Sequence, residues 1–176
     1  MIAFDVLKAA VLVFAAAIAQ VSIFSSVTVL GGSPDVLLVT LVCVALLRGS
    51  IYGAAAGFGA GLVVDTATLE TLGVTSLLLT LAGYWIGRYG ETTGRDRGHA
   101  PFLSIAVVTV LYAAGALALN FLLGEPAPAR HVLYETLFQG IALNLLVTVP
   151  VYALARRALR PEPARLPQGQ EVRLLG

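Results

Sequence analysis

The chain has 176 residues, of which 58% are hydrophobic and 12% are charged, and its mean hydropathy is +0.89. This composition leaves no stretch long enough for a separate soluble domain, so it predicts one integral membrane domain. The formal net charge of +1 gives no indication of nucleic-acid binding, and the single cysteine, Cys43, excludes an internal disulfide framework and a thiolate metal cluster.

Apolar stretches, taken in chain order, predict six transmembrane helices in a compact all-α membrane bundle. They cover residues 9–24, 34–47, 51–64, 74–86, 102–123 and 132–154. The second and third stretches are short, because about 14 residues at 1.5 Å each reach roughly 21 Å across a hydrocarbon core about 30 Å thick. Either the bilayer is thinner there, or neighbouring polar segments enter it under the cover of protein.

Basic residues are distributed unevenly between the two ends of these predicted helices. Ten of the 11 lysines and arginines lie on the side shared by both termini, and only Arg130 lies on the other side. Because lysine and arginine resist translocation, we predict that both termini are cytoplasmic and that this basic side faces anionic lipid headgroups. We expect residues 1–158 to form the six-helix transmembrane domain and residues 159–176 to form a basic, disordered cytoplasmic tail.

Four amide side chains lie within the predicted helices: Gln20 in the first helix, Asn120 near the outer end of the fifth, and Gln139 and Asn144 in the sixth. An amide inside a bilayer needs a hydrogen-bonding partner, so we expect these side chains to point inward and to bond between helices. Lining a ligand cavity is the alternative role.

Two aspartates flank the second and third predicted helices on the outer side. Asp35 lies in the first turn of the second helix, where the helix dipole stabilises an anion, whereas Asp65 lies near the end of the third, where the dipole of that helix does not. Together with three glutamates they give the outer side an excess of negative charge. We therefore expect an outer acidic rim that includes both residues. Helix capping by Asp35 and a simple boundary position for Asp65 are the alternatives.

The third predicted helix carries glycine at every fourth position, at Gly53, Gly57 and Gly61. A stripe of this kind lets another helix backbone approach closely, where van der Waals packing replaces the hydrophobic drive that lipid does not supply. We expect packing against a helix of the same chain. A partner interface, including a homodimer, is the alternative.

No catalytic motif accompanies these residues. The segment that ends at Asp65 lacks the Gly-x-Gly-Asp order of intramembrane aspartyl proteases, and the sequence contains neither a Gly-x-Ser-x-Gly elbow nor a Walker-type phosphate loop. The two histidines, His99 and His131, fall on opposite predicted sides of the membrane, which argues against a shared metal site. We therefore expect no enzymatic activity, no metal and no cofactor.

Short motifs follow one another in a fixed order along nearly the whole chain. They are Gln20, Gly32-x-Pro34-Asp35-Val36-Leu37-Leu38, Leu47-Arg48-Gly49, Gly53-x-x-x-Gly57-Phe58-x-x-Gly61-Leu62-x-x-Asp65, Gly73, Gly83-Tyr84, and Asn144 with Pro150. In order, spacing and chain length, this set resembles the MreD family of rod-shape-determining membrane proteins. The residues after Arg160 match no part of that pattern.

The resemblance implies a non-catalytic, multi-pass assembly factor of the bacterial cytoplasmic (inner) membrane. Such a protein would bind MreC and support peptidoglycan synthesis and cell shape, alongside the actin-like MreB, the RodA glycosyltransferase and a class B transpeptidase. The family's helical arrangement is similar to that of the substrate-binding S components of energy-coupling-factor transporters. A vitamin-transporter S component is therefore the alternative function, and the small-residue spacing Ala15-x-x-x-Ala19 is compatible with it.

Overall fold

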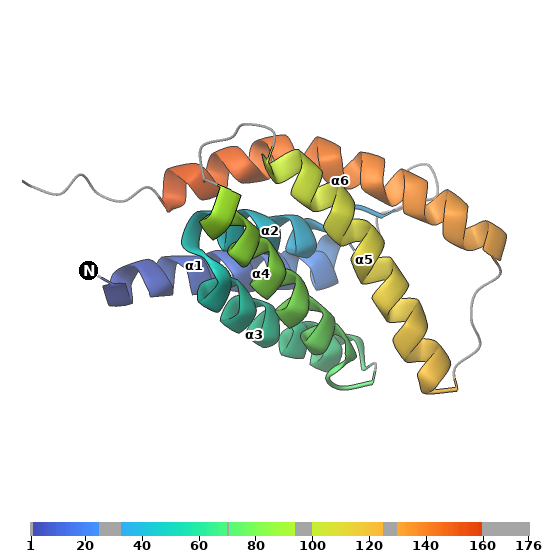
Figure 1. Ribbon diagram of the computed structural model, residues 1–176. Helices are drawn as coiled ribbons and strands as arrows, with labels where there is room; N and C mark the ends of the chain where they lie inside the picture. The colour runs from blue at the N-terminus through green and yellow to red at the C-terminus, as the bar shows by residue number, and fades with distance from the viewer. Residues whose placement is uncertain (1, 25–32, 70, 94–99, 125–129, 160–176) are drawn as a thin grey trace, which may run out of the picture.

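The computed structural model describes residues 2–24, 33–69, 71–93, 100–124 and 130–159 (Figure 1). Within these ranges the chain contains six α-helices, one short π-helical segment and no strand, which confirms the all-α prediction. Most of the predicted tail, residues 160–176, lies outside the described residues. The elements are α1 (Ile2–Ala19), the π segment η1 (Gln20–Phe24), α2 (Val36–Arg48), α3 (Ser50–Thr68), α4 (Val74–Thr93), α5 (Ala100–Leu122) and α6 (Arg130–Ala158).

The short helix α2 lies at the centre of the bundle and contacts each of the other five α-helices. Its residues from Leu37 to Leu46 are all buried. A helix that is apolar on every side is expected in such an enclosed position. Because protein surrounds α2, its 13 residues need not match the thickness of the hydrocarbon core. The short second apolar stretch therefore requires no thinning of the bilayer.

Three helices on the outside of the bundle, α1, α5 and α6, are long and apolar enough to cross a membrane. The qualifying segments are Val6–Ile23, Ala100–Leu119 and Leu137–Ala158. Large apolar side chains on these helices remain exposed, among them Phe14 on α1 and Leu146 on α6. Among the described helices, α2 is too short for this class and α3 and α4 do not reach it. Three helices thus meet the criteria of length and hydropathy for a membrane span on their own, whereas the sequence predicted six transmembrane helices.

The helices α5 and α6 lie beside each other over only part of their lengths (Figure 1). The beginning of α5 lies beside the later part of α6, and the two helices diverge toward the end of α5 and the beginning of α6. Two further hydrogen bonds show which helix ends lie at the same end of the bundle. Arg48 Nη2 donates to the carbonyl oxygen of Leu159 at 3.4 Å, and the N–H of Ser50 donates to Glu91 Oε1 at 2.8 Å.

These contacts bring together the ends of α2, α4 and α6 and the beginning of α3. Arginine side chains collect there, and we call this part of the molecule the basic end. Its defining residues are Arg48, Arg88, Arg156 and Arg157.

Candidate functional site

Polar side chains from three other elements surround the beginning of α2. The backbone N–H of Asp35 donates to Asn144 Oδ1 at 2.8 Å, and that of Val36 donates to Gln20 Oε1 at 2.8 Å. Asn144 Nδ2 in turn donates to Thr109 Oγ1 at 3.2 Å. We call the side chains of Gln20, Asp35, Thr109 and Asn144 the amide cluster. It joins η1, α5 and α6 to the central helix.

The amide cluster allows α2 to begin inside the bundle without water. The first N–H groups of any α-helix lack partners within the helix, and each would cost several kcal/mol if left unsatisfied in hydrocarbon. Asn144 and Gln20 accept hydrogen bonds from two such groups, and Asp35 Oδ1 accepts a third from the N–H of Leu38 at 2.8 Å. The Gln20 amide also donates to the carbonyl oxygen of Pro34 at 3.3 Å. The cluster is therefore a cap built from distant parts of the chain.

Of the four predicted amides, the side chain of Asn120 lies outside the described part of the structure, and the other three do not share one environment. Asn144 is 2% exposed, and Gln20, the first residue of η1, is half-buried. Gln139 is also half-buried on α6, but no hydrogen bond among the described residues links it to the amide cluster. Only Gln20 and Asn144 are brought together, through the backbone of α2.

Asp65 is only 1% exposed and faces the beginning of α4. Its carboxylate accepts hydrogen bonds from the N–H groups of Gly73 at 2.8 Å, Thr75 at 3.2 Å and Ser76 at 3.3 Å. The positive end of the α4 dipole therefore stabilises this charge, although the dipole of α3 does not. The prediction of an outer acidic rim did not include this capping role for Asp65, whose side chain is buried against α4. Asp35 serves α2 and Asp65 serves α4, so the two aspartates cap different helices.

Glu91 caps the beginning of α3 at the basic end, as Asp65 caps the beginning of α4. Its Oε1 accepts hydrogen bonds from the N–H of Ser50 at 2.8 Å and from Ser50 Oγ at 3.0 Å, at the beginning of α3. The backbone N–H of Ser50 lowers the pKa of Glu91, and the Ser50 hydroxyl and Arg88 lower this pKa further. An acid near the end of each antiparallel helix thus caps the beginning of the other, and α3 and α4 form a reciprocally capped hairpin.

The glycine stripe of α3 faces the backbone of α4. A Cβ added at Gly53, Gly57 or Gly61 would overlap backbone atoms of Gly83, Leu79 or Ser76, respectively. Close approach of this kind permits van der Waals and Cα–H···O contacts along the whole hairpin. The stripe therefore lies inside the α3–α4 contact, within one chain.

Sequence reasoning did not single out the α4 side of this contact or the role of Glu91. A Cβ at Gly83 would overlap the carbonyl of Gly53, and a Cβ at Gly87 would overlap the backbone where α3 begins. Gly83, Gly87 and Glu91 are spaced by four residues, as are the three glycines of α3 and Asp65. This shared four-residue spacing is the sequence feature that could have indicated the contact. In each helix the glycines are followed, on the same helical face, by an acidic residue.

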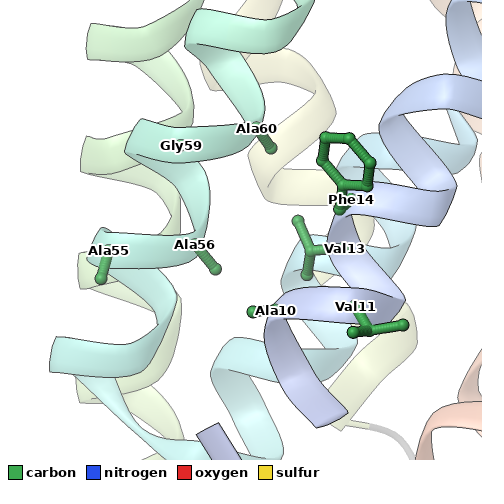
Figure 2. A pocket seen from close by; sticks show the side chains of 8 residues that line it. All are labelled: Ala10, Val11, Val13, Phe14, Ala55, Ala56, Gly59 and Ala60. Carbon is green, nitrogen blue, oxygen red and sulfur yellow. The ribbon is translucent and has the colours of Figure 1, made fainter. Parts of the chain in front are cut away.

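Two apolar grooves run along α1. The first encloses about 410 Å³ between α1 and α3, and Figure 2 shows the side chains of Val13, Phe14, Ala56 and Ala60 around it. The second encloses about 710 Å³ between α1 and α6, and Val36 and Thr40 near the beginning of α2 also line it. Its polar lining residues are Lys8 and Thr40. Binding of a polar small molecule usually needs several converging donors and acceptors, which the described residues of these grooves do not supply.

The described acidic side chains form hydrogen bonds within the protein and do not form a metal site. Within the described ranges, no group of three or more histidine, cysteine, aspartate or glutamate side chains could hold a metal ion. Asp35, Asp65 and Glu91 all accept hydrogen bonds from the N–H groups at the beginning of a helix. Their geometry therefore stabilises the helix arrangement.

A family model described as rod shape-determining protein MreD matches residues 2–158. No curated protein and no solved structure matches the chain.

Proposed function

Because the chain belongs to the MreD family of rod shape-determining proteins, we propose that it is a non-catalytic membrane assembly factor of the bacterial cell-elongation complex. The match over residues 2–158 carries this proposal, since it includes every described helix. The exposed apolar faces of α1, α5 and α6 support a place in the cytoplasmic membrane. Asp35, Asp65 and Glu91 all cap helices, and this structural use supports a role without chemistry.

We propose that MreC is the direct partner, and that MreB, RodA and a class B transpeptidase belong to the wider complex. An assembly factor needs a stable outer surface that a partner can recognise. The reciprocally capped hairpin and the amide cluster supply internal stability of this kind, because they satisfy polar groups that would otherwise compete for partners.

We further propose that all six helices cross the membrane together, with the basic end in the cytoplasm. The helices α2, α3 and α4 would cross within the bundle, where α1, α5 and α6 supply lipid-facing surface. The arginines of the basic end support this orientation through the positive-inside rule. A cysteine at Leu69, which is 91% exposed, should react with an impermeant reagent outside intact cells, and one at Gln168 only after lysis. Reaction of the Gln168 site in intact cells would reverse the proposed orientation.

Co-purification from native membranes tests the function. A tagged chain should recover MreC at stoichiometric yield, and depletion of the chain should make rod-shaped cells round even in medium saturated with vitamins. A transporter S component would instead recover a coupling subunit, ATPases and a vitamin-sized ligand. Recovery of that second set, or rescue of cell shape by vitamins, would replace our proposal with the transport alternative.

A further inference from the structure

A pocket of about 630 Å³ lies between the beginning of α5 and the end of α6, separate from the grooves along α1. It combines charged and apolar walls. Its lining residues are Phe102, Val149, Tyr152, Ala153, Arg156 and Arg157.

Within the described part of the chain, no acidic side chain forms an ion pair with the charged wall of this pocket. Arg156 and Arg157 are both exposed in the last turn of α6. Among the described residues, the ion pair of the basic end joins Arg88 to Glu91 at 3.5 Å, and Glu91 also binds Ser50. Two neighbouring guanidinium groups therefore remain available to an external anion. Guanidinium suits phosphate, because its planar set of donors can bind two oxygens at once.

The apolar wall shows what else the ligand must contain. Val149 is 59% exposed and Phe102 is 40% exposed. Val149 lies nearer the middle of α6 than the two arginines, and Phe102 lies in the first turn of α5. The apolar segment of α6, Leu137–Ala158, is 22 residues long and spans roughly 33 Å, close to the thickness of a hydrocarbon core. Its two arginines therefore lie at headgroup depth, and its valine lies at the depth of acyl chains.

We propose that this pocket binds one anionic phospholipid. The phosphate contacts Arg156 and Arg157, and an acyl chain lies against Phe102 and Val149. A free phosphate ion would satisfy the two arginines but would leave the apolar wall exposed, so the combination fits a lipid. Basic pockets between helix ends are a recurrent form of headgroup site. This binding does not depend on MreC.

Native mass spectrometry of the delipidated full-length chain can test the site, with phosphatidylglycerol and phosphatidylcholine supplied at equal concentrations. We expect the wild type to retain phosphatidylglycerol preferentially. The double variant R156Q/R157Q should bind it about 30-fold more weakly, which corresponds to about 1 kcal/mol for each arginine. The variant R165Q/R173Q, which removes the same charge from the tail, should keep wild-type affinity. An equal loss in the tail variant would show a general charge effect and overturn the proposal.

Two further experiments distinguish the alternatives. The first distinguishes binding in the pocket from attraction to surface charge, and the second distinguishes binding of a lipid from binding of a free phosphate group. Ala153→Trp fills the pocket at an exposed position without changing charge, so it should also weaken retention of phosphatidylglycerol. Unchanged retention in this variant would contradict a site in the pocket. Glycerol 3-phosphate at the lipid's concentration should not displace phosphatidylglycerol. Full displacement would identify a free-phosphate site and refute the lipid assignment.

Discussion

The contact between α3 and α4 makes opposite predictions for two glycines that are two residues apart. Gly57 faces α4, and an added Cβ would overlap the carbonyl group of Leu79 and lie 3.0 Å from the backbone nitrogen of Thr80. Gly59 lies on the other side of α3, and a Cβ there would meet nothing within 4 Å. Gly57→Ala should therefore destabilise the protein, whereas Gly59→Ala should not.

The expected magnitudes follow from the kind of atom that the new methyl group meets. Overpacking a tight contact typically costs about 1–3 kcal/mol, and the upper value applies here because a helix backbone cannot rotate away as a side chain can. Replacing glycine by alanine within a helix returns about 1 kcal/mol. Gly57→Ala should thus lose about 2 kcal/mol, and Gly59→Ala should gain up to about 1 kcal/mol. The difference of about 3 kcal/mol is more than 100-fold in the folding equilibrium.

Reversible unfolding in mixed micelles, with an increasing share of sodium dodecyl sulfate and followed by far-ultraviolet circular dichroism, measures this difference. Both variants make the same chemical change on the same helix, so propensity and detergent effects cancel in the comparison. Equal stabilities within about 0.5 kcal/mol would refute the reasoning, because the Gly57 face could not then be in backbone contact with α4.

Three other predictions concern the polar contacts. Asn144→Leu leaves the N–H of Asp35 without its acceptor and should destabilise the protein by about 1–3 kcal/mol in the same unfolding assay, whereas Gln139→Leu should have a smaller effect. Asp65→Asn should lower the unfolding midpoint while the folded fraction still captures MreC in a pull-down; a loss of capture at unchanged stability would restore the acidic-rim hypothesis. Because the pKa of Glu91 is lowered in the folded protein, its contribution to stability should be present above the ordinary pKa of about 4.3 and be lost as pH falls through the lowered value. Glu91→Gln should be less sensitive to pH in that acidic range, and a wild-type pH dependence in this variant would exclude the assignment.

The helices could be located from sequence because their signal is local. Each predicted apolar stretch coincides with a helix, and the spacing of Gly53, Gly57 and Gly61 indicates a close helix contact before any partner is known. The number of independent spans was less accessible, since hydropathy does not distinguish lipid from protein surroundings. α2 is apolar because other helices enclose it.

The caps were harder to assign, because they depend on which helix ends meet. The sequence places Asp65 near the end of its own helix, where that helix's dipole is unfavourable, but the dipole that acts on its carboxylate belongs to α4. Gln20 and Asn144 both bond to the backbone at the beginning of α2, and nothing in the sequence around either amide indicates that. Glu91 could have been found by extending the four-residue spacing from Gly83 and Gly87.

The cap at the beginning of α2 also sets a condition on biogenesis. Asp35 and its acceptor Asn144 are 109 residues apart in the chain. At a synthesis rate of about 5–20 residues per second, the acceptor is made roughly 5–22 s after the helix that needs it. Until α6 has been inserted, the central helix must depend on water, lipid headgroups or the insertion machinery for that hydrogen bond. A chain truncated before Asn144 therefore lacks a hydrogen bond at a helix that was completed long before the truncation.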